Sequence, residues 1–302
     1  MSNEADYMLK VTDVCKKYGK YEVLKQMSFT VPKGSIYGLV GRNGAGKTTI
    51  MRIISGLQKP TSGKVEYGFD HKGYGKIGAL VELPSIYSSK SARENLIFQY
   101  INLGLKIDDS VDELLKLVSL DNTGKKKAGR FSLGMRQRLG IAMAMAGDPD
   151  MLILDEPING LDPQGIIEMR DLLQRLNREK GTTIIISSHI LTELSKLATN
   201  FAFVEGGEVV KEVTIEDVEN AGGVQSEFFS SDPQGLLRVL KEKGLDARIE
   251  EGTGIIRVKG VFNLTDVVME ASKQGVNIAR VSTRETDLET YFINLVGGHG
   301  NV

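Results

Sequence analysis

A glycine-rich segment that ends in a lysine and two threonines carries the most recognisable chemistry in this sequence. Residues 41–49 read Gly-Arg-Asn-Gly-Ala-Gly-Lys-Thr-Thr and follow the apolar run of residues 36–40. Successive glycines let backbone N–H groups converge on phosphate oxygens, and a helix that starts near Lys47 directs the positive end of its dipole at them. Lys47 is placed to reach the outer phosphates, and Thr48 to offer its hydroxyl to Mg²⁺. The segment therefore predicts a loop that binds a nucleoside triphosphate, formed by Gly41, Arg42, Asn43, Gly44, Ala45, Gly46, Lys47, Thr48 and Thr49.

An ordinary glycine-rich turn is the alternative to this phosphate loop, because the chain contains 34 glycines. The apolar run before the loop has the length of a buried strand, and apolar residues after it recur at helical spacing. These residues are Ile50, Met51, Ile53, Ile54 and Leu57. A strand that turns through the loop into a helix favours the phosphate-binding interpretation.

Two adjacent carboxylates follow a second apolar run. Residues 151–154 lead into Asp155, Glu156 and Pro157. A buried strand here would deliver both acids to the carboxyl edge of a sheet, where the phosphates would sit. Asp155 is suited to hold Mg²⁺ through its water shell, and Glu156 to polarise a water that attacks the terminal phosphate. In isolation a simple turn after a core strand would be the better interpretation, but the upstream phosphate loop favours a hydrolytic site.

The elements that must position these residues form an α/β core. Residues 7–14 and 23–31 alternate apolar and polar side chains, which predicts two antiparallel strands. Three later segments lack this alternation, as expected of strands buried on both faces of a parallel sheet. They are residues 76–81, 151–155 and 182–187. Helical patterns lie at residues 92–103, 110–120, 134–146 and 165–180, which predicts a helix-covered core with a mainly helical insertion near residues 90–130.

The pattern changes after about residue 214. Strands are predicted at residues 227–230, 246–250, 255–259 and 278–281, with helices at 233–243 and 263–274. This β-α-β-β-α-β order is the ferredoxin-like arrangement, an α+β fold. A closing helix is predicted at residues 287–295. The stretch Ala221-Gly222-Gly223 marks the expected boundary between the two domains.

Composition indicates a globular chain of about two domains. Hydrophobic residues make up 41% of the 302 residues, and 38 basic residues balance 39 acidic ones, for a net charge of −1. This balance argues against a nucleic-acid or anionic-lipid surface. The one basic run, Lys125-Lys126-Lys127 with Arg130, is interpreted as a solvated loop.

Cysteine usage and hydropathy indicate the compartment. The single cysteine, Cys15, excludes an internal disulfide and suits the cytoplasm. No apolar run approaches the ~18 residues of a membrane span. Any function at a membrane would therefore need another subunit to cross the bilayer.

Residues 131–138, Phe-Ser-Leu-Gly-Met-Arg-Gln-Arg, complete a set of motifs that resembles the ATPase subunit of an ABC transporter over about residues 5–215. The resemblance implies a P-loop NTPase core at residues 5–220 with an antiparallel β subdomain, a helical subdomain at about 90–150, and an accessory domain at 222–302. Ser132 and Gly134 would belong to the signature motif, which caps the ATP bound to a second copy of the domain. The N–H groups at a helix start suit the charge of a γ-phosphate.

Three further positions match the same family. The resemblance implies that Tyr18 stacks on adenine, that Asp162 communicates across a dimer, and that His189 is a switch histidine on the γ-phosphate. Taken alone, Tyr18 is equally an exposed turn residue, Asp162 a turn residue and His189 a structural histidine. Their register with the other motifs favours the functional roles, and Lys47, Glu156 and His189 then form the catalytic set.

Three positions depart from the family pattern. Glu82 stands where the family offers a glutamine to Mg²⁺ and the attacking water. A carboxylate ligates Mg²⁺ more strongly but adds negative charge near the phosphates, and a solvent-exposed glutamate is the alternative. Leu133 and Met135 replace the usual glycine and glutamine of the signature, and Met135 cannot donate hydrogen bonds. Since the motif residues named above are otherwise present, hydrolysis is still expected.

A narrower resemblance rests on Glu82, on the Leu-Pro-Ser-Ile-Tyr that follows it and on the C-terminal Thr-Asp-Leu-Glu-Thr-Tyr-Phe. These match the exporter branch linked to bacitracin-type antibiotic and lantibiotic resistance. Export of antimicrobial peptides or antibiotics is therefore expected. An import ATPase, a soluble ABC protein of translation or DNA repair, and a P-loop kinase stay open as alternatives.

The resemblance also implies cofactors and partners. ATP and Mg²⁺ are expected, with Thr48, Asp155 and Glu82 on the metal. In the family fold one phosphate loop and one signature motif lie too far apart to serve a single ATP, so a head-to-tail homodimer is expected. It would drive a separate transmembrane permease, docked near the Glu82 loop and the helical insertion, from the cytoplasmic face of the membrane and without nucleic acid.

Overall fold

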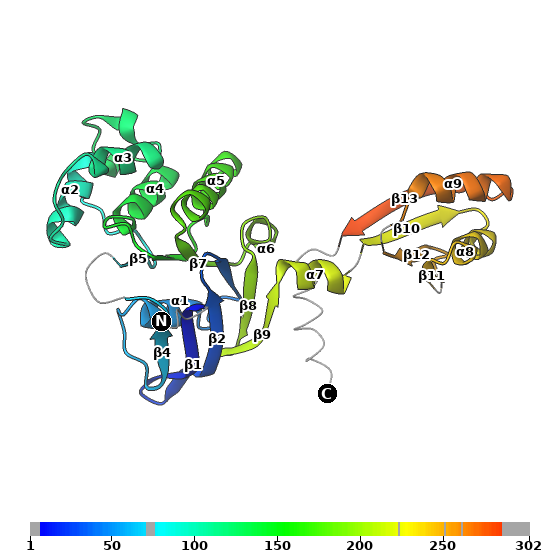
Figure 1. The fold of residues 1–302 in the computed structure, drawn as a ribbon, viewed down its shortest axis with the longest axis horizontal. Helices are drawn as coiled ribbons and strands as arrows, with labels where there is room; N and C mark the ends of the chain where they lie inside the picture. The colour runs from blue at the N-terminus through cyan, green and yellow to red at the C-terminus, as the bar shows by residue number, and fades with distance from the viewer. Residues whose placement is uncertain (1–6, 71–75, 223, 251, 261, 286–302) are drawn as a thin grey trace, which may run out of the picture. The chain divides into compact units, whose positions relative to one another are not determined.

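The computed structural model describes residues 7–70, 76–222, 224–250, 252–260 and 262–285. By its internal contacts the chain consists of two compact units, Met1–Val213 and Thr214–Val302. Figure 1 shows the elements of each unit. No helix in the described part of the chain is long and apolar enough to cross a membrane.

A six-stranded sheet forms the centre of the first unit. Its strands, in spatial order, are β5 (Ile77–Leu80), β6 (Met151–Asp155), β7 (Thr183–Ser188), β3 (Ile36–Val40), β8 (Asn200–Glu205) and β9 (Glu208–Thr214). The neighbours from β5 to β8 pair in parallel. Every residue of β3, β6 and β7 is buried, which explains the missing alternation in their sequences. The three predicted parallel strands are confirmed, whereas β8 and β9 were not predicted.

Helix α1 (Lys47–Ile54) packs between this sheet and a smaller antiparallel one (Figure 1). The smaller sheet has the order β2-β1-β4, with β1 at Tyr7–Tyr18, β2 at Tyr21–Pro32 and β4 at Ser62–Tyr67. Phe29, Ile50 and Ile153 bring the three layers into one buried core. The predicted antiparallel pair is confirmed and is longer than predicted at each strand's turn end. Strand β4 was not predicted, because its side chains are exposed or half-buried and show no apolar alternation.

Helices α2 (Ala92–Asn102), α3 (Ser110–Leu117) and α4 (Leu133–Ala144) form the predicted helical insertion. They lie together in Figure 1, away from β1, β2 and β4. Ser91 and Glu94 cap α2 reciprocally, each side chain accepting from the other's backbone N–H. The helix predicted at residues 165–180 is α5 (Pro163–Lys180). A short helix, α6 (Leu191–Leu194), follows β7.

The second unit contains a four-stranded antiparallel sheet with two helices on one face. Its elements are α7 (Ile215–Gly222), β10 (Val224–Ser230), α8 (Pro233–Glu242), β11 (Asp246–Ile249), β12 (Ile256–Lys259), α9 (Leu264–Lys273) and β13 (Ile278–Glu285). The spatial order β11-β12-β10-β13 confirms the predicted ferredoxin-like arrangement. Phe228, Leu236, Val258 and Val267 share its core. Helix α7 was not predicted, and the predicted helix at 287–295 lies outside the described residues.

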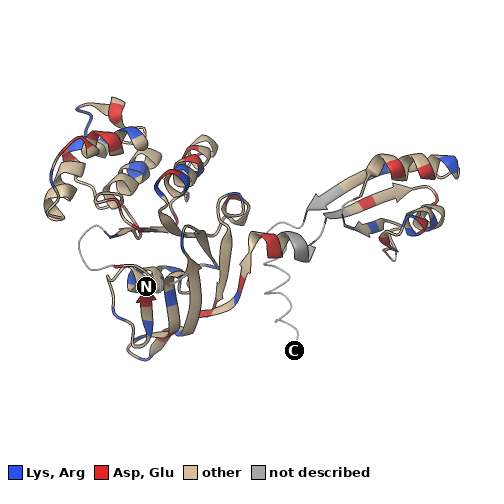
Figure 2. Ribbon diagram, in the orientation of Figure 1, with Lys and Arg blue, Asp and Glu red and all other residues tan. Residues whose placement is uncertain are grey.

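Basic and acidic residues are interspersed along the elements of each unit (Figure 2). This distribution accords with a net charge of −1 and with the absence of a large basic field in the sequence. The basic run at residues 125–127 is exposed, as predicted for a solvated loop.

Candidate nucleotide-binding site

The loop between β3 and α1 requires glycine at several positions. Gly44 and Gly46 have φ values of +83° and +108°, in the left-handed region that favours glycine. A Cβ atom on Gly41 would lie 2.3 Å from the carbonyl oxygen of Val204, so β8 prevents any larger residue there. No side chain caps the N-terminus of α1, which leaves its first N–H groups directed at the loop. These are the features of an anion-binding helix start.

Lys47 is a buried lysine that folds back over this loop. Its ammonium donates to the carbonyl oxygens of Gly41 (2.6 Å) and Arg42 (3.2 Å) and lies 3.9 Å from Oε1 of Glu156. Burial lowers the pKa of Lys47, while the carboxylates of Glu156 and Asp155 oppose that shift. A cation held this way needs an anionic partner at the loop, which a phosphate would supply.

Asp155 is the buried last residue of β6 and joins three elements. Its Oδ2 accepts from the hydroxyl of Thr48 on α1 at 2.8 Å. Its Oδ1 accepts from the hydroxyl of Ser187 on β7 at 2.6 Å. The structure therefore brings two of the three residues predicted to bind the metal, Thr48 and Asp155, into direct contact.

Ser187 is a site residue that sequence reasoning missed. Besides donating to Asp155, its Oγ accepts from the backbone N–H of Glu156 at 2.9 Å. The signal was its position at the end of a predicted strand, two residues before His189. Ser187 contacts Asp155 because β6 pairs with β7, and this pairing places the two residues opposite each other.

Glu156 and His189 form the outward part of the cluster. Oε2 of Glu156 lies 2.7 Å from Nδ1 of His189, and its Oε1 faces Lys47. Glu156 has φ = +51°, an unusual conformation for a non-glycine residue, which turns its side chain out of the strand direction. A carboxylate held between a lysine and an imidazole beside a phosphate loop can accept a proton from an attacking water.

The residues of the predicted signature motif form a second site. Ser132 caps α4 and Asp162 caps α5, each accepting from a backbone N–H of its helix. Both residues, with Gly134, line one cavity of about 380 Å³. Of the described residues that line it, none belongs to the cluster around Lys47. The phosphate loop and the residues of the predicted signature motif therefore lie at two separate places in the described part of the chain.

Comparison with known proteins identifies the family. The family described as ABC transporter matches residues 24–159. A bacitracin transport ATP-binding protein, BcrA of Bacillus licheniformis, is 40% identical over 305 residues, which cover 96% of this chain and 98% of that protein. This chain belongs to the ABC transporter ATP-binding proteins. It is thus an ABC-type ATPase, which binds and hydrolyses ATP, as predicted from its motifs.

Two further comparisons agree with this assignment. The lantibiotic transport ATP-binding protein SrtF of Streptococcus pyogenes is 42% identical over 216 residues, which cover 70% of this chain and 93% of SrtF. The cassette MJ0796, solved as a dimer in a post-hydrolysis state with ADP and Pi, superposes with a TM-score of 0.61 at 25% identity. That match covers 69% of this chain and 99% of MJ0796. The predicted P-loop core of the ABC ATPase is therefore confirmed.

Tyr18 and Glu82 lie apart from the central cluster of this ABC ATPase. The hydroxyl of Tyr18, at the end of β1, donates to Oε1 of Gln58 at 2.8 Å, and the ring is 45% exposed. Glu82 follows β5 with φ = +68° and pairs with Arg52 on α1. Neither side chain touches Thr48 or Asp155 in the hydrogen bonds of the described residues.

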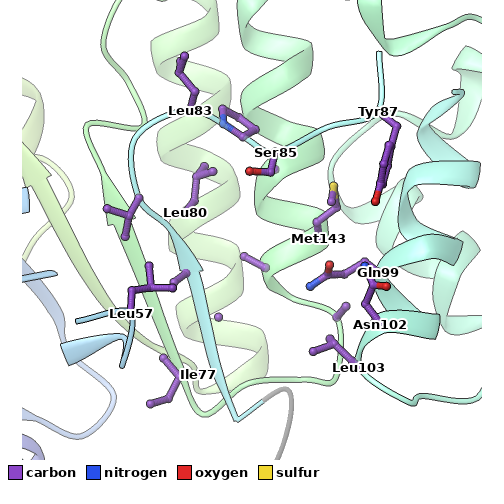
Figure 3. Close-up of a pocket in the computed structure, with 17 residues that line it drawn as sticks. Leu57, Ile77, Leu80, Leu83, Ser85, Tyr87, Gln99, Asn102, Leu103 and Met143 are labelled. Carbon is purple, nitrogen blue, oxygen red and sulfur yellow. The ribbon is translucent and has the colours of Figure 1, made fainter. Parts of the chain in front are cut away.

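The segment after Glu82 borders a groove of about 400 Å³ (Figure 3). Leu83 and Tyr87 line it from this segment, and Leu103 and Met143 from the helical insertion. Leu83 is 77% exposed, unusual for an apolar side chain. A Cβ on Gly140 would lie 2.8 Å from Pro84, so glycine lets the segment lie close to α4. The groove is a partly apolar surface at the junction of sheet and insertion.

Proposed function

We propose that this chain is the ATP-hydrolysing subunit of an exporter for antimicrobial peptides or antibiotics, acting with a separate membrane permease. The observation that carries the hydrolytic role is Glu156, held between Lys47 and His189 beside the phosphate loop. The export role is supported by the relatives, since BcrA and SrtF are named for bacitracin and lantibiotic transport. We infer an ATPase domain at residues 5–220 and an accessory domain at 222–302.

The donor set at the phosphate loop fits Mg²⁺. Thr48 and Asp155 place a hydroxyl and a carboxylate oxygen 2.8 Å apart, and hard oxygen ligands are those Mg²⁺ prefers. Among the described residues, no group of three or more acidic, histidine or cysteine side chains could hold a metal ion, so ATP phosphates and water would complete the coordination. Mg²⁺ would supply charge neutralisation at the β- and γ-phosphates. Glu82 is our third candidate metal residue.

Each residue of the proposed site has a defined role in ATP binding or hydrolysis. Lys47 and the N–H groups of the loop hold the phosphates in place. Glu156 accepts the proton of the attacking water at its carboxylate, and His189 orients that carboxylate and contacts the γ-phosphate. Tyr18 stacks on the adenine ring.

Two copies of the chain would complete each site. The cavity that contains Ser132, Gly134 and Asp162 shares no lining residue with the phosphate-loop cluster, so a head-to-tail dimer would bring them together around ATP. The dimeric cassette MJ0796 supports this proposal. Closure on ATP and reopening after hydrolysis would be the mechanical step.

The groove in Figure 3 is our candidate for permease docking. A segment of the permease would cover the exposed side chains of Leu83 and Tyr87. Leu83 directly follows Glu82 in the chain, so the groove lies next to a candidate metal residue. The subunit would then work on the cytoplasmic face of the membrane through its permease. An import ATPase would share all these features and differ in its genetic neighbours.

The variant Glu156→Gln tests the proposal. It should abolish turnover while ATP-dependent dimers persist, because the amide cannot accept the water proton but leaves the loop intact. Glu113→Gln, on an exposed face of α3, is the matched control and should hydrolyse ATP normally. Normal hydrolysis by Glu156→Gln would refute the assigned base. An ATPase stimulated by a co-purified polytopic partner would support the transport role.

A further inference from the structure

Glu82 has one ionic partner among the described residues, Arg52 on α1. An Nη2 atom of Arg52 contacts Oε1 of Glu82, and both side chains are partly exposed, by 35% and 59%. Arg52 is four residues beyond Thr48, so the two side chains lie on the same face of α1, one turn apart. The helix that offers a hydroxyl to the metal therefore also holds the carboxylate proposed to reach it.

Strand pairing sets the edge of the sheet at which the chain reaches Glu82. β5 pairs in parallel with β6, with Leu80 opposite Leu154. The residues that follow, Glu82 on one strand and Asp155 and Glu156 on the other, therefore leave the sheet at the same edge. Carboxylates that leave a sheet at the same edge carry like charges. The guanidinium of Arg52 offsets the charge of Glu82.

We propose that Arg52 is a positioning residue that competes with the metal for the carboxylate of Glu82. This inference rests on the proposed metal role of Glu82. In the structure Glu82 pairs with Arg52; binding of Mg²⁺·ATP would draw the Glu82 carboxylate away from Arg52 and toward the metal. An exposed ion pair is weak enough for this exchange.

The pair also lies at one end of the groove segment. Glu82 adopts φ = +68°, and the next residues, Leu83 and Pro84, line the groove (Figure 3). A partner that presses on Leu83 would therefore shift the backbone that carries Glu82. The ion pair between Arg52 and Glu82 would oppose such a shift. A neutral glutamine at position 82 would lack the charge attraction to Arg52.

The test measures metal affinity directly. Mn²⁺ is the probe for Mg²⁺, and its binding to the protein complex with the non-hydrolysable analogue AMP-PNP is followed by electron paramagnetic resonance. Arg52→Gln should tighten Mn²⁺ binding about two- to fivefold, the range by which an exposed ion pair can shift an equilibrium. Arg52→Lys, which keeps the charge, should bind Mn²⁺ close to the wild-type affinity. In the Glu82→Gln background, Arg52→Gln should have no effect.

Two controls separate this inference from the proposed metal site. Asp155→Asn should weaken Mn²⁺ binding; if it does not, the metal site and the inference fail together. If Asp155→Asn weakens binding but Arg52→Gln changes nothing, only the inference is overturned. An equal Arg52→Gln effect with and without Glu82 would also overturn it, because Arg52 would then act on the nucleotide itself. Thermal melting of each variant shows whether it is folded.

Discussion

The hydroxyl of Ser187 donates to Oδ1 of Asp155 at 2.6 Å and is completely buried while doing so. The hydroxyl oxygen of Ser187 also accepts from the backbone N–H of Glu156. One small side chain on β7 thus orients both the carboxylate proposed to bind the metal and the backbone of the proposed general base, and such supporting contacts tune a site strongly.

Ser187→Ala should lower kcat about tenfold or more, because Oδ1 of Asp155 loses its hydrogen-bond donor. ATP affinity should change little, since the phosphate loop is untouched. Steady-state hydrolysis and equilibrium binding of a fluorescent ATP analogue measure the two effects. Ser187→Thr keeps the hydroxyl and should retain most of the rate. Equal losses in the two variants would show that packing, not the hydrogen bond, matters at this position.

His189→Ala should reduce kcat about 10²-fold, the usual contribution of a positioned acid–base partner. Nδ1 of His189 lies 2.7 Å from Oε2 of Glu156, and its loss frees that carboxylate to rotate. Single-turnover hydrolysis with radiolabelled ATP isolates the chemical step from product release. A single-turnover rate equal to that of the wild type would show that His189 has no role in the chemical step.

Gly41→Ala should unfold the loop region or prevent ATP binding. The added Cβ would lie 2.3 Å from the carbonyl oxygen of Val204, and the backbone must move at a cost of about 1–3 kcal/mol. Gly134→Ala is the matched control, since its Cβ would meet only Leu161 at an ordinary 3.6 Å. Chemical denaturation should show a loss for the first variant and none for the second. A fully stable, ATP-binding Gly41→Ala protein would contradict this account of the loop.

The buried phenol of Tyr37 should make the free energy of unfolding depend on pH in the alkaline range. Burial, and then the carboxylate of Glu212 that its hydroxyl bonds at 2.7 Å, raise the pKa of this phenol well above its ordinary value. The folded state keeps the proton, so the stabilisation is complete below the pKa of the unfolded chain, near 10, and decreases as the pH rises above it.

Tyr37→Phe should therefore cost about 1 kcal/mol of unfolding free energy at neutral pH, the contribution of one buried hydrogen bond. The difference from wild type should shrink as the pH rises above 10. Urea unfolding at a series of pH values measures it. A gap that stays constant up to high pH would show that Tyr37 does not titrate differently in the two states.

Local sequence was sufficient for the elements that carry most of the chemistry. The phosphate loop and the strand that ends at Asp155 depend on neighbours in the chain, such as glycines at special backbone angles and unbroken apolar runs. Strand β4 was missed because its exposed and half-buried side chains show no apolar alternation, so its partner β1 defines it.

Contacts between elements were decided only by the tertiary structure. The sheet order β5-β6-β7-β3-β8-β9 does not follow the chain, so no local pattern placed Ser187 beside Asp155 or Glu82 beside Arg52. Residue types and spacing along the chain determined that this protein handles a triphosphate. The packing of distant strands against α1 decided which side chains support that chemistry, because hydrogen bonds and ion pairs depend on distances in space that chain separation does not set.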